Sequence, residues 1–179
     1  MRIALPFRLM GLVLACAGLP CAAQSTAVFT TGPLLDDFGP AATVEDAAPI
    51  PAHMHLRVRF DISEGAKDDE LNRSLVTAAR FLNMHARAGV PARRMHIALV
   101  VHGRAVFDVL HKRTSQRAKD NAALVAALQQ HDVRLYVCGQ SAAYYEVTSD
   151  QLLPGVQMSL SAMTAHAVLA AEGYELNPF

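Results

Sequence analysis

The sequence has no tryptophan, no Cys-x-x-Cys pair, no glycine-rich loop of the kind that cradles phosphates and no internal repeat. The missing motifs leave nucleotide binding and thioredoxin-like exchange without support. The composition is that of an ordinary globular protein, with 52% hydrophobic and 18% charged residues, so neither a coiled coil nor wholesale disorder is indicated. What is there fits one domain preceded by a leader.

The amino terminus has the layout of a cleaved signal peptide over residues 1–23. Arg2 and Arg8 supply the positive start, and residues 9–19 form an uncharged apolar run. Small residues at 21–23 resemble a cleavage site. The apolar run is shorter than the roughly 20 residues of a membrane span. We therefore expect a periplasmic or secreted protein with no membrane attachment after cleavage; an uncleaved anchor or a lipidated cysteine is the alternative.

Cleavage would change both the charge and the cysteine count. The remaining chain has 14 Lys and Arg against 16 Asp and Glu, a formal charge of −2, which gives no reason to expect nucleic acid as a partner. Cys16 and Cys21 would be removed, leaving Cys138 as the one thiol. An exported chain with a single cysteine cannot form an internal disulfide. Cys138 is then either buried and inert or a reactive thiol with an external partner.

Residues 24–54 are rich in Ala, Pro, Thr, Gly and Asp, which indicates an extended, partly ordered arm that leads into a domain over residues 55–179. His53 and His55 alternate at the boundary between the arm and the domain and could bind a metal. No further ligands lie nearby in the sequence, so a solvated pair before a strand is favoured, and no metal or other cofactor is predicted.

Hydrophobic periodicity alternates between strand and helix along the rest of the chain. Asp68 and Asp69 are placed to cap the first helix, and Ser161 the last. Alternation of this kind predicts an α/β fold with a five-stranded, mainly parallel sheet and helices on both faces. The expected strands are residues 55–62, 95–101, 133–137, 156–160 and 174–176, and the expected helices are residues 69–88, 105–113, 119–131, 140–146 and 161–172.

Polar or reactive residues follow three of the expected strands. All strands of a parallel sheet end on the same side, so these residues could share one rim. Cys138 also precedes a helix start, where unpaired N–H groups favour the thiolate. His102 could stabilise that thiolate as a cation or act as a general base. The candidate catalytic residues are Cys138 and His102, and the candidate substrate-binding residues are Asp61, Gly103, Gly139, Gln140 and Ser141.

Other interpretations of these residues remain open. A lone cysteine at a strand end is often a small buried hydrophobic residue, and a lone histidine is often a hydrogen-bonded structural one. Gly139 would allow a substrate or partner backbone to approach the sulfur closely. No role is assigned to the remaining histidines, which fall on expected strands or helices without ligand spacing: His85, His96, His131 and His166.

Six segments in order resemble the DsrE/DsrF-like family: VRFDISEG (58–65), ELNRSLVTAARFLN (70–83), HIALVVHG (96–103), VRLYVCGQS (133–141), DQLLPGV (150–156) and EGYEL (172–176). The resemblance implies a five-stranded α/β fold that assembles into trimers or hexamers. It also implies transfer of sulfane sulfur as a cysteine persulfide, with Cys138 in the region of the sulfur-carrying cysteine and His102 where such proteins often have histidine. The relay proteins of the family are cytoplasmic, whereas this leader indicates export.

Three functional hypotheses follow. The first is an exported sulfur carrier that uses Cys138 and exchanges sulfur with a donor or acceptor protein. The second is a non-catalytic, oligomeric module that binds a small ligand and buries Cys138. The third, thiol redox sensing, shares the reactive thiol with the first.

Overall fold

The computed structural model describes residues 28–67, 70–111 and 116–178, and the side chains of residues 116–120 are outside that description. The signal peptide expected over residues 1–23 and the cap expected at Asp68 and Asp69 lie outside the described residues. The strands are β1 (Leu56–Ile62), β2 (Met95–Val101), β3 (Arg134–Cys138), β4 (Val156–Ser159) and β5 (Glu175–Asn177). The helices are α1 (Arg73–Arg87), α2 (Gln116–Gln129), α3 (Gly139–Tyr144) and α4 (Ala162–Ala171), with short 3₁₀ turns η1 (Ala92–Arg94), η2 (Gly103–Val109) and η3 (Ser149–Gln151).

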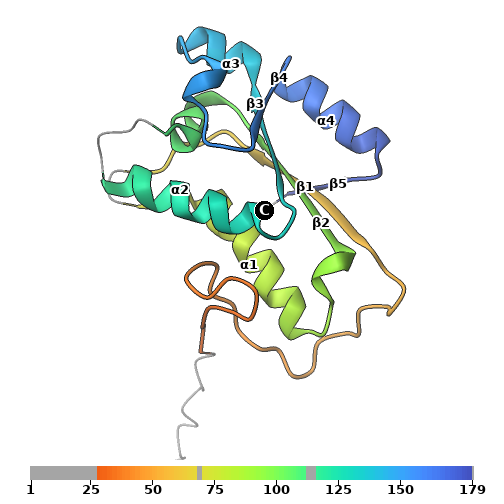
Figure 1. Cartoon of the computed structure of the whole chain (residues 1–179). Helices are drawn as coiled ribbons and strands as arrows, with labels where there is room; N and C mark the ends of the chain where they lie inside the picture. Colours follow the sequence, from red (N-terminus) through yellow and green to blue (C-terminus); the bar gives the residue numbers. More distant parts are fainter. Residues whose placement is uncertain (1–27, 68–69, 112–115, 179) are drawn as a thin grey trace, which may run out of the picture.

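The five strands form one sheet in the order β4-β3-β2-β1-β5, and every neighbouring pair is parallel. Helices α1 and α2 cover one face of the sheet, and α4 lies across the other (Figure 1). The α/β class and the five-stranded parallel sheet are therefore confirmed. In the part of the chain that the structure describes, no helix combines the length and the apolar character needed to cross a membrane.

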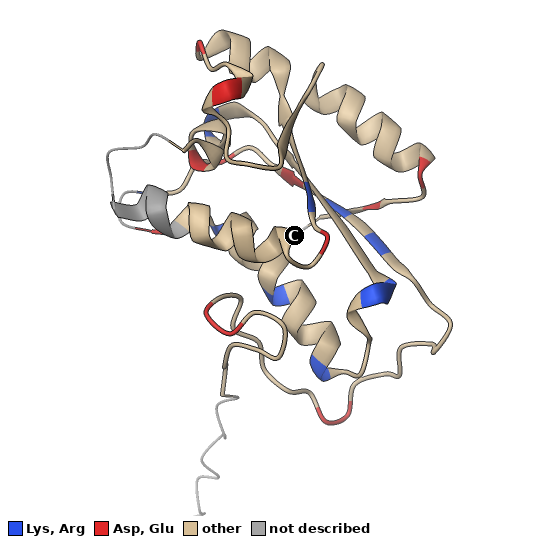
Figure 2. Ribbon diagram, in the orientation of Figure 1, with Lys and Arg blue, Asp and Glu red and all other residues tan. Residues whose placement is uncertain are grey.

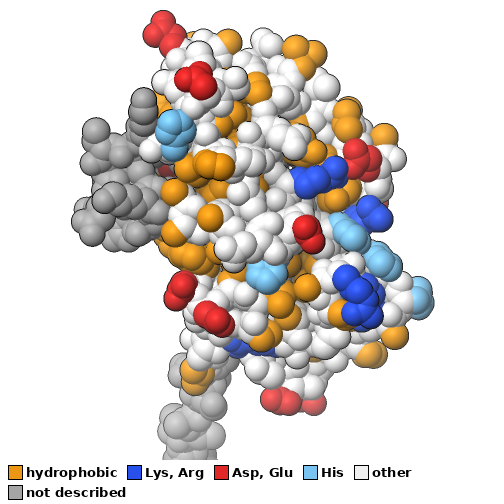
Figure 3. Space-filling model, in the orientation of Figure 1, with side chains coloured by type: hydrophobic (Ala, Val, Ile, Leu, Met, Phe, Trp, Pro, Cys, Tyr) orange, Lys and Arg blue, Asp and Glu red, His pale blue; other side chains and the backbone are white. Residues whose placement is uncertain are grey.

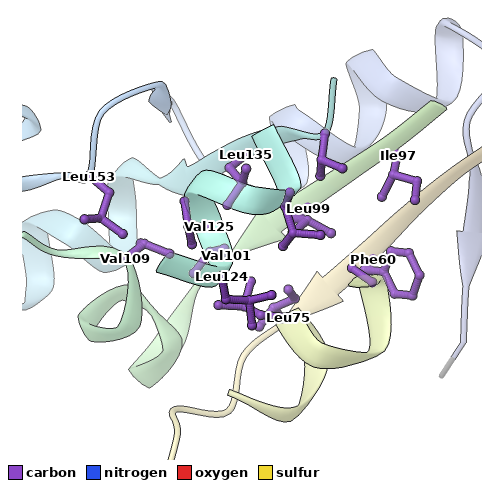
Figure 4. Packing of buried hydrophobic residues seen from close by; sticks show 14 of the residues in the cluster. Phe60, Leu75, Ile97, Leu99, Val101, Val109, Leu124, Val125, Leu135 and Leu153 are labelled. Carbon is purple, nitrogen blue, oxygen red and sulfur yellow. The ribbon is translucent and has the colours of Figure 1, made fainter. Parts of the chain in front are cut away.

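The main core lies between the sheet and α1 and α2. Strand β2 is central and almost wholly buried, which explains its continuous apolar run, whereas β1 alternates. Figure 4 shows Phe60, Leu99, Val101 and Leu135 of the strands meeting Leu75 and Leu124 of the helices. Burying one such side chain stabilises the fold by about 1.5–3 kcal/mol. A smaller cluster fills the other face beneath α4: Ala98, Val100, Ala165, Leu169 and Tyr174.

Helix α1 begins at Arg73, later than residue 69, where the sequence predicted its start. Its cap is Asn72, whose side-chain oxygen accepts from the N–H groups of Ser74 and Leu75 at 3.0 and 3.3 Å. Asn72 is 1% exposed and its side-chain amide donates to Asp108 at 2.8 Å. These contacts with distant segments fix the cap, and periodicity alone cannot reveal them.

The described part of the arm is looped beneath α1 instead of extended (Figure 1). A bridge between Thr30 and Ala41 closes the loop. The buried Asn83 of α1 accepts from the N–H groups of Leu34 and Leu35 at 3.1 and 2.9 Å and donates to carbonyls of the loop. Arg87 donates to four further arm carbonyls. The arm is thus fastened to the domain by hydrogen bonds.

Candidate functional site

The ends of β1, β2 and β3 meet at one edge of the sheet, as the parallel arrangement predicts. Val101 of β2 pairs with Val137 of β3, so the next residues in register are His102 and Cys138. Asp61 belongs to the neighbouring β1, where it pairs with Val100. Side chains alternate along strands, so Asp61, His102 and Cys138 lie on the side of the sheet that carries α4.

Cys138 ends β3 and directly precedes α3, and it is only 6% exposed. Burial is the largest single influence on its pKa and raises it. The opposing influences together are stronger: hydrogen bonding from the backbone and hydroxyl of Ser141 and from the N–H groups of Ala162 and Gln140. The pKa of Cys138 is therefore lowered below its usual value, which favours the thiolate.

Ser141 connects the end of β2 to the sulfur. The N–H of Gly103 donates to the Ser141 hydroxyl oxygen at 3.1 Å. A hydroxyl can accept and donate at the same time, and the Ser141 hydroxyl also donates its hydrogen to the Cys138 sulfur. Two of the residues expected to bind substrate, Gly103 and Ser141, thus support the thiol in the folded chain.

Gly139 and Gln140 contact the segment that joins β4 to α4. A Cβ on Gly139 would lie 2.6 Å from the Ser159 carbonyl oxygen, so a side chain does not fit there. The Gln140 side chain donates to the Leu160 carbonyl at 3.3 Å. The close approach that the sequence suggested for a substrate at Gly139 is made instead by the chain's own backbone. This packing brings α4 up to the sulfur.

Asp61 joins two histidines through one carboxylate oxygen. Its Oδ1 lies 3.0 Å from His102 Nε2 and 2.7 Å from His166 Nε2, and Arg59 Nε donates to His166 Nδ1 at 3.2 Å. Partial burial is the largest single influence on the pKa of Asp61 and raises it, but the hydrogen bonds from the two histidines, together with their charge when they are protonated, lower it. The carboxylate is thus held ionised beside the thiol rim.

The sequence did not lead us to assign a role to His166, although its position on one face of a helix indicated that it points toward the sheet. It lies on α4, where Ala162, Ala165, His166 and Leu169 follow the spacing of one helical face. Ala165 and Leu169 are buried against the sheet, so a histidine on this face is directed toward the strands. Among the described residues, no hydrogen bond joins His102 to Cys138, and His102 is held by Asp61.

A second histidine pair lies at the opposite end of the strands. The rings of His55 and His96 are stacked with centroids 5.6 Å apart, and His55 Nδ1 lies 3.3 Å from His96 Nε2. The pKa of His96 is lowered by partial burial first, and then by Arg57 and His55. The described part of the chain has no group of three or more His, Cys, Asp or Glu side chains that could hold a metal ion.

An apolar hollow of about 210 Å³ lies on the thiol side of the sheet, between β3, β4 and α4. Its lining includes Ser159, which pairs with Cys138 in the β3–β4 register, and Tyr136, two residues before Cys138. A second apolar hollow, of about 220 Å³, lies between the arm and the end of α1, away from the thiol.

The DsrE/DsrF-like family model matches residues 59–178. A solved protein of unknown function from Methanobacterium thermoautotrophicum, MTH1491, superposes with a TM-score of 0.52 at 21% identity and covers 68% of this chain and 97% of its own. The ychN protein from E. coli gives a TM-score of 0.51 at 12% identity with the same coverage. No curated protein matches the sequence. At these identities the two structures support the fold alone.

Proposed function

This chain belongs to the DsrE/DsrF-like family, and from that membership we propose that it is an exported sulfane-sulfur carrier in which Cys138 holds the sulfur as a persulfide. The family match supports a sulfur-relay role in general. We add to it that Cys138 alone carries the sulfur and that the chain is exported.

The observation that carries the proposal is the set of donors around the Cys138 sulfur. Two N–H groups of α3, the first N–H of α4 and one hydroxyl stabilise a negative charge there. A persulfide carries its charge on the outer sulfur, and a carrier must alternate between thiolate and persulfide. Donors at the inner sulfur stabilise the thiolate, which attacks during uptake and is the leaving group when the acceptor removes the outer sulfur.

Uptake from thiosulfate illustrates the balance of the reaction. The Cys138 thiolate attacks the outer sulfur, a new sulfur–sulfur bond forms, and the original one breaks with its electron pair on the departing sulfite. The Cys138 persulfide remains. An acceptor thiolate then attacks the outer sulfur and restores the Cys138 thiolate. Neither step requires an oxidant.

Export and assembly complete the proposal. Residues 1–23 act as the signal peptide, so Cys138 is the thiol of the exported chain. We further propose a homo-oligomer, a trimer or hexamer. Large hydrophobic side chains are exposed on and before α4, among them Leu160 (72%), Met163 (79%) and Val168 (52%), and Figure 3 shows hydrophobic atoms at the surface in that region. A monomeric mass by light scattering at micromolar concentration would contradict this.

The test of the carrier is intact-mass measurement after incubation of the mature protein with thiosulfate or polysulfide. We expect an added sulfur atom that cyanide or a reductant removes, and no addition in Cys138→Ser. The mature chain has no other cysteine, so sulfur that is added to the wild type and not to Cys138→Ser must be bound to Cys138. No removable addition, or an equal addition in the variant, would refute sulfur transfer by Cys138.

A second candidate function, a non-catalytic small-ligand module, is favoured by one observation: Cys138 is only 6% exposed. Reagent size separates the two. A carrier thiol with a lowered pKa reacts with small iodoacetamide near neutral pH and more slowly with a bulky aromatic disulfide. A buried, inert thiol reacts with neither until the protein is unfolded. Fast reaction followed by stable sulfenic acid formation with peroxide would favour redox sensing instead.

A further inference from the structure

Four side chains form a hydrogen-bonded chain across the thiol rim. Arg59 of β1 contacts His166 of α4, His166 contacts Asp61 of β1, and Asp61 contacts His102 at the end of β2. The donors and acceptors along this chain can be assigned from chemistry. Arginine can only donate, and an ionised carboxylate can only accept.

These constraints fix the state of His166. Its Nδ1 lies 3.2 Å from Arg59 Nε, which donates, so Nδ1 must carry a lone pair. Its Nε2 lies 2.7 Å from the Asp61 carboxylate, which accepts, so Nε2 must carry the hydrogen. His166 is therefore a neutral imidazole with both nitrogens occupied. A proton added at Nδ1 would break the bond to Arg59 and place two cations together.

His102 is bonded to the same carboxylate oxygen but differs at its other nitrogen. Its Nε2 donates to Asp61 at 3.0 Å. Among the residues that the structure describes, none bonds its Nδ1, and the side chain is 29% exposed. The Nδ1 lone pair is therefore open to a proton donor.

We infer that His102 Nδ1 is the proton-exchanging group of the thiol rim, and that Arg59, His166 and Asp61 are positioning residues that hold its ring in this tautomer. The inference rests on the proposed sulfur-carrier function for its chemistry, and on the observed contacts for its geometry. His102 and Cys138 directly follow the paired residues Val101 and Val137 of neighbouring strands, which places both at the same edge of the sheet.

The proton has a defined route when the donor is a persulfide, R–S–SH. The Cys138 S–H proton passes to His102 Nδ1. The Cys138 sulfur bonds to the donor's outer sulfur, and the donor's sulfur–sulfur bond breaks with its electron pair on R–S⁻. That thiolate then takes the proton from His102, so the products are the Cys138 persulfide and R–SH.

Under this assignment, replacement by glutamine should preserve sulfur uptake at position 166 and impair it at position 102. Glutamine supplies both an N–H donor and an oxygen acceptor, so it can replace a neutral His166, but it has no basic nitrogen to replace His102. The probe is glutathione persulfide, and the readout is the rate of sulfur addition to Cys138 by rapid-quench mass measurement. His102→Phe and His166→Phe should both slow uptake, by about a hundredfold at position 102.

The glutamine variants then decide between the roles. His166→Gln should recover most of the rate that His166→Phe loses, whereas His102→Gln should recover none of the loss in His102→Phe. Recovery by glutamine at position 102, or failure to recover at position 166 in a variant with native circular dichroism and melting temperature, would overturn the assignment.

Nitrogen-15 NMR of the histidine rings tests the geometry without any sulfur transfer. In the wild-type protein at pH 8, His166 and His102 should both be in the Nε2–H tautomer, and Asp61→Asn should disturb both signals. An Nδ1–H tautomer at either position would refute the hydrogen-bonded chain. If the tautomers are as expected but the wild type takes up no sulfur, the carrier function fails and the positioning of His102 stands.

Discussion

The backbone N–H of Ala162, the first residue of α4, faces the sulfur of Cys138 at the end of β3. This pairing makes the thiolate depend on the docking of α4, whose other contacts include the small apolar cluster beneath it and the bonds of His166 to Asp61 and Arg59. Acidic and basic residues are dispersed over the fold (Figure 2), and the influences on the pKa of Cys138 are burial and hydrogen bonds.

Replacement of Ser141 by alanine should raise the pKa of the Cys138 thiol by about one unit, because a hydrogen bond to a charged group contributes about 1.5 kcal/mol and one pKa unit corresponds to about 1.4 kcal/mol. The pKa is measured from thiolate absorbance near 240 nm. Ser159→Ala is the matched control, since the Ser159 hydroxyl donates to the Ser161 carbonyl. Equal shifts in the two variants would exclude a specific role for Ser141.

Gly139→Ala should lower the free energy of unfolding by about 1–3 kcal/mol, as expected for a side chain forced into packed backbone. The new Cβ would lie 2.6 Å from the Ser159 carbonyl oxygen, so the β4–α4 segment must shift. That shift should also move α4 away from the sulfur and raise the thiol pKa. Urea unfolding measures the first effect, with the exposed Ala143→Ser as control. Unchanged stability and unchanged thiol pKa would contradict this role.

Asp61→Asn should reduce stability at neutral pH and have less effect in acid. The pKa of Asp61 is lowered in the folded chain, so its contribution is present above the unfolded value near pH 4 and is lost as the pH falls through the folded value. Because Asp61 is partly exposed, we expect a difference below about 1 kcal/mol. Urea unfolding from pH 3 to 7 measures it, with Glu45→Gln as the charge control. A difference that grows as the pH falls would have the wrong sign.

Asn83→Ala should release the arm and leave the thiol unaffected. The substitution strands the N–H groups of Leu34 and Leu35 and several loop carbonyls, which should cost about 3 kcal/mol. Limited proteolysis should then cut the arm rapidly, whereas the Cys138 pKa should not change. The control is Thr77→Ala, whose hydroxyl bonds the Arg73 carbonyl within α1. Resistance to proteolysis equal to that of the wild type would show that Asn83 does not hold the arm.

The sequence was sufficient for the features that depend on local pattern. Strand alternation and parallel topology predicted that Asp61, His102 and Cys138 would share one rim, and the cap at Ser161 is confirmed, with its side chain accepting from the Thr164 N–H at 3.0 Å. The cysteine before a helix start also indicated a lowered thiol pKa, and the structure has it.

Features that depend on contacts between segments distant in the sequence could not be predicted from local pattern. The donor from Ala162 and the bond from His166 require the path of α4 across the sheet, which periodicity does not give. The start of α1 at Arg73 depends on Asn72 being fixed by Asp108. The role of Gly139 depends on the position of the Ser159 carbonyl.

The strand order β4-β3-β2-β1-β5 has a consequence for the timing of assembly. The first strand of the domain is completed on one side by the last, and α4 lies just before that last strand. Cys138 is therefore synthesised before the segment that carries Ala162, so the nascent thiol lacks one of the donors that lower its pKa. The thiol pKa should therefore reach its fully lowered value only after α4 has docked on the sheet.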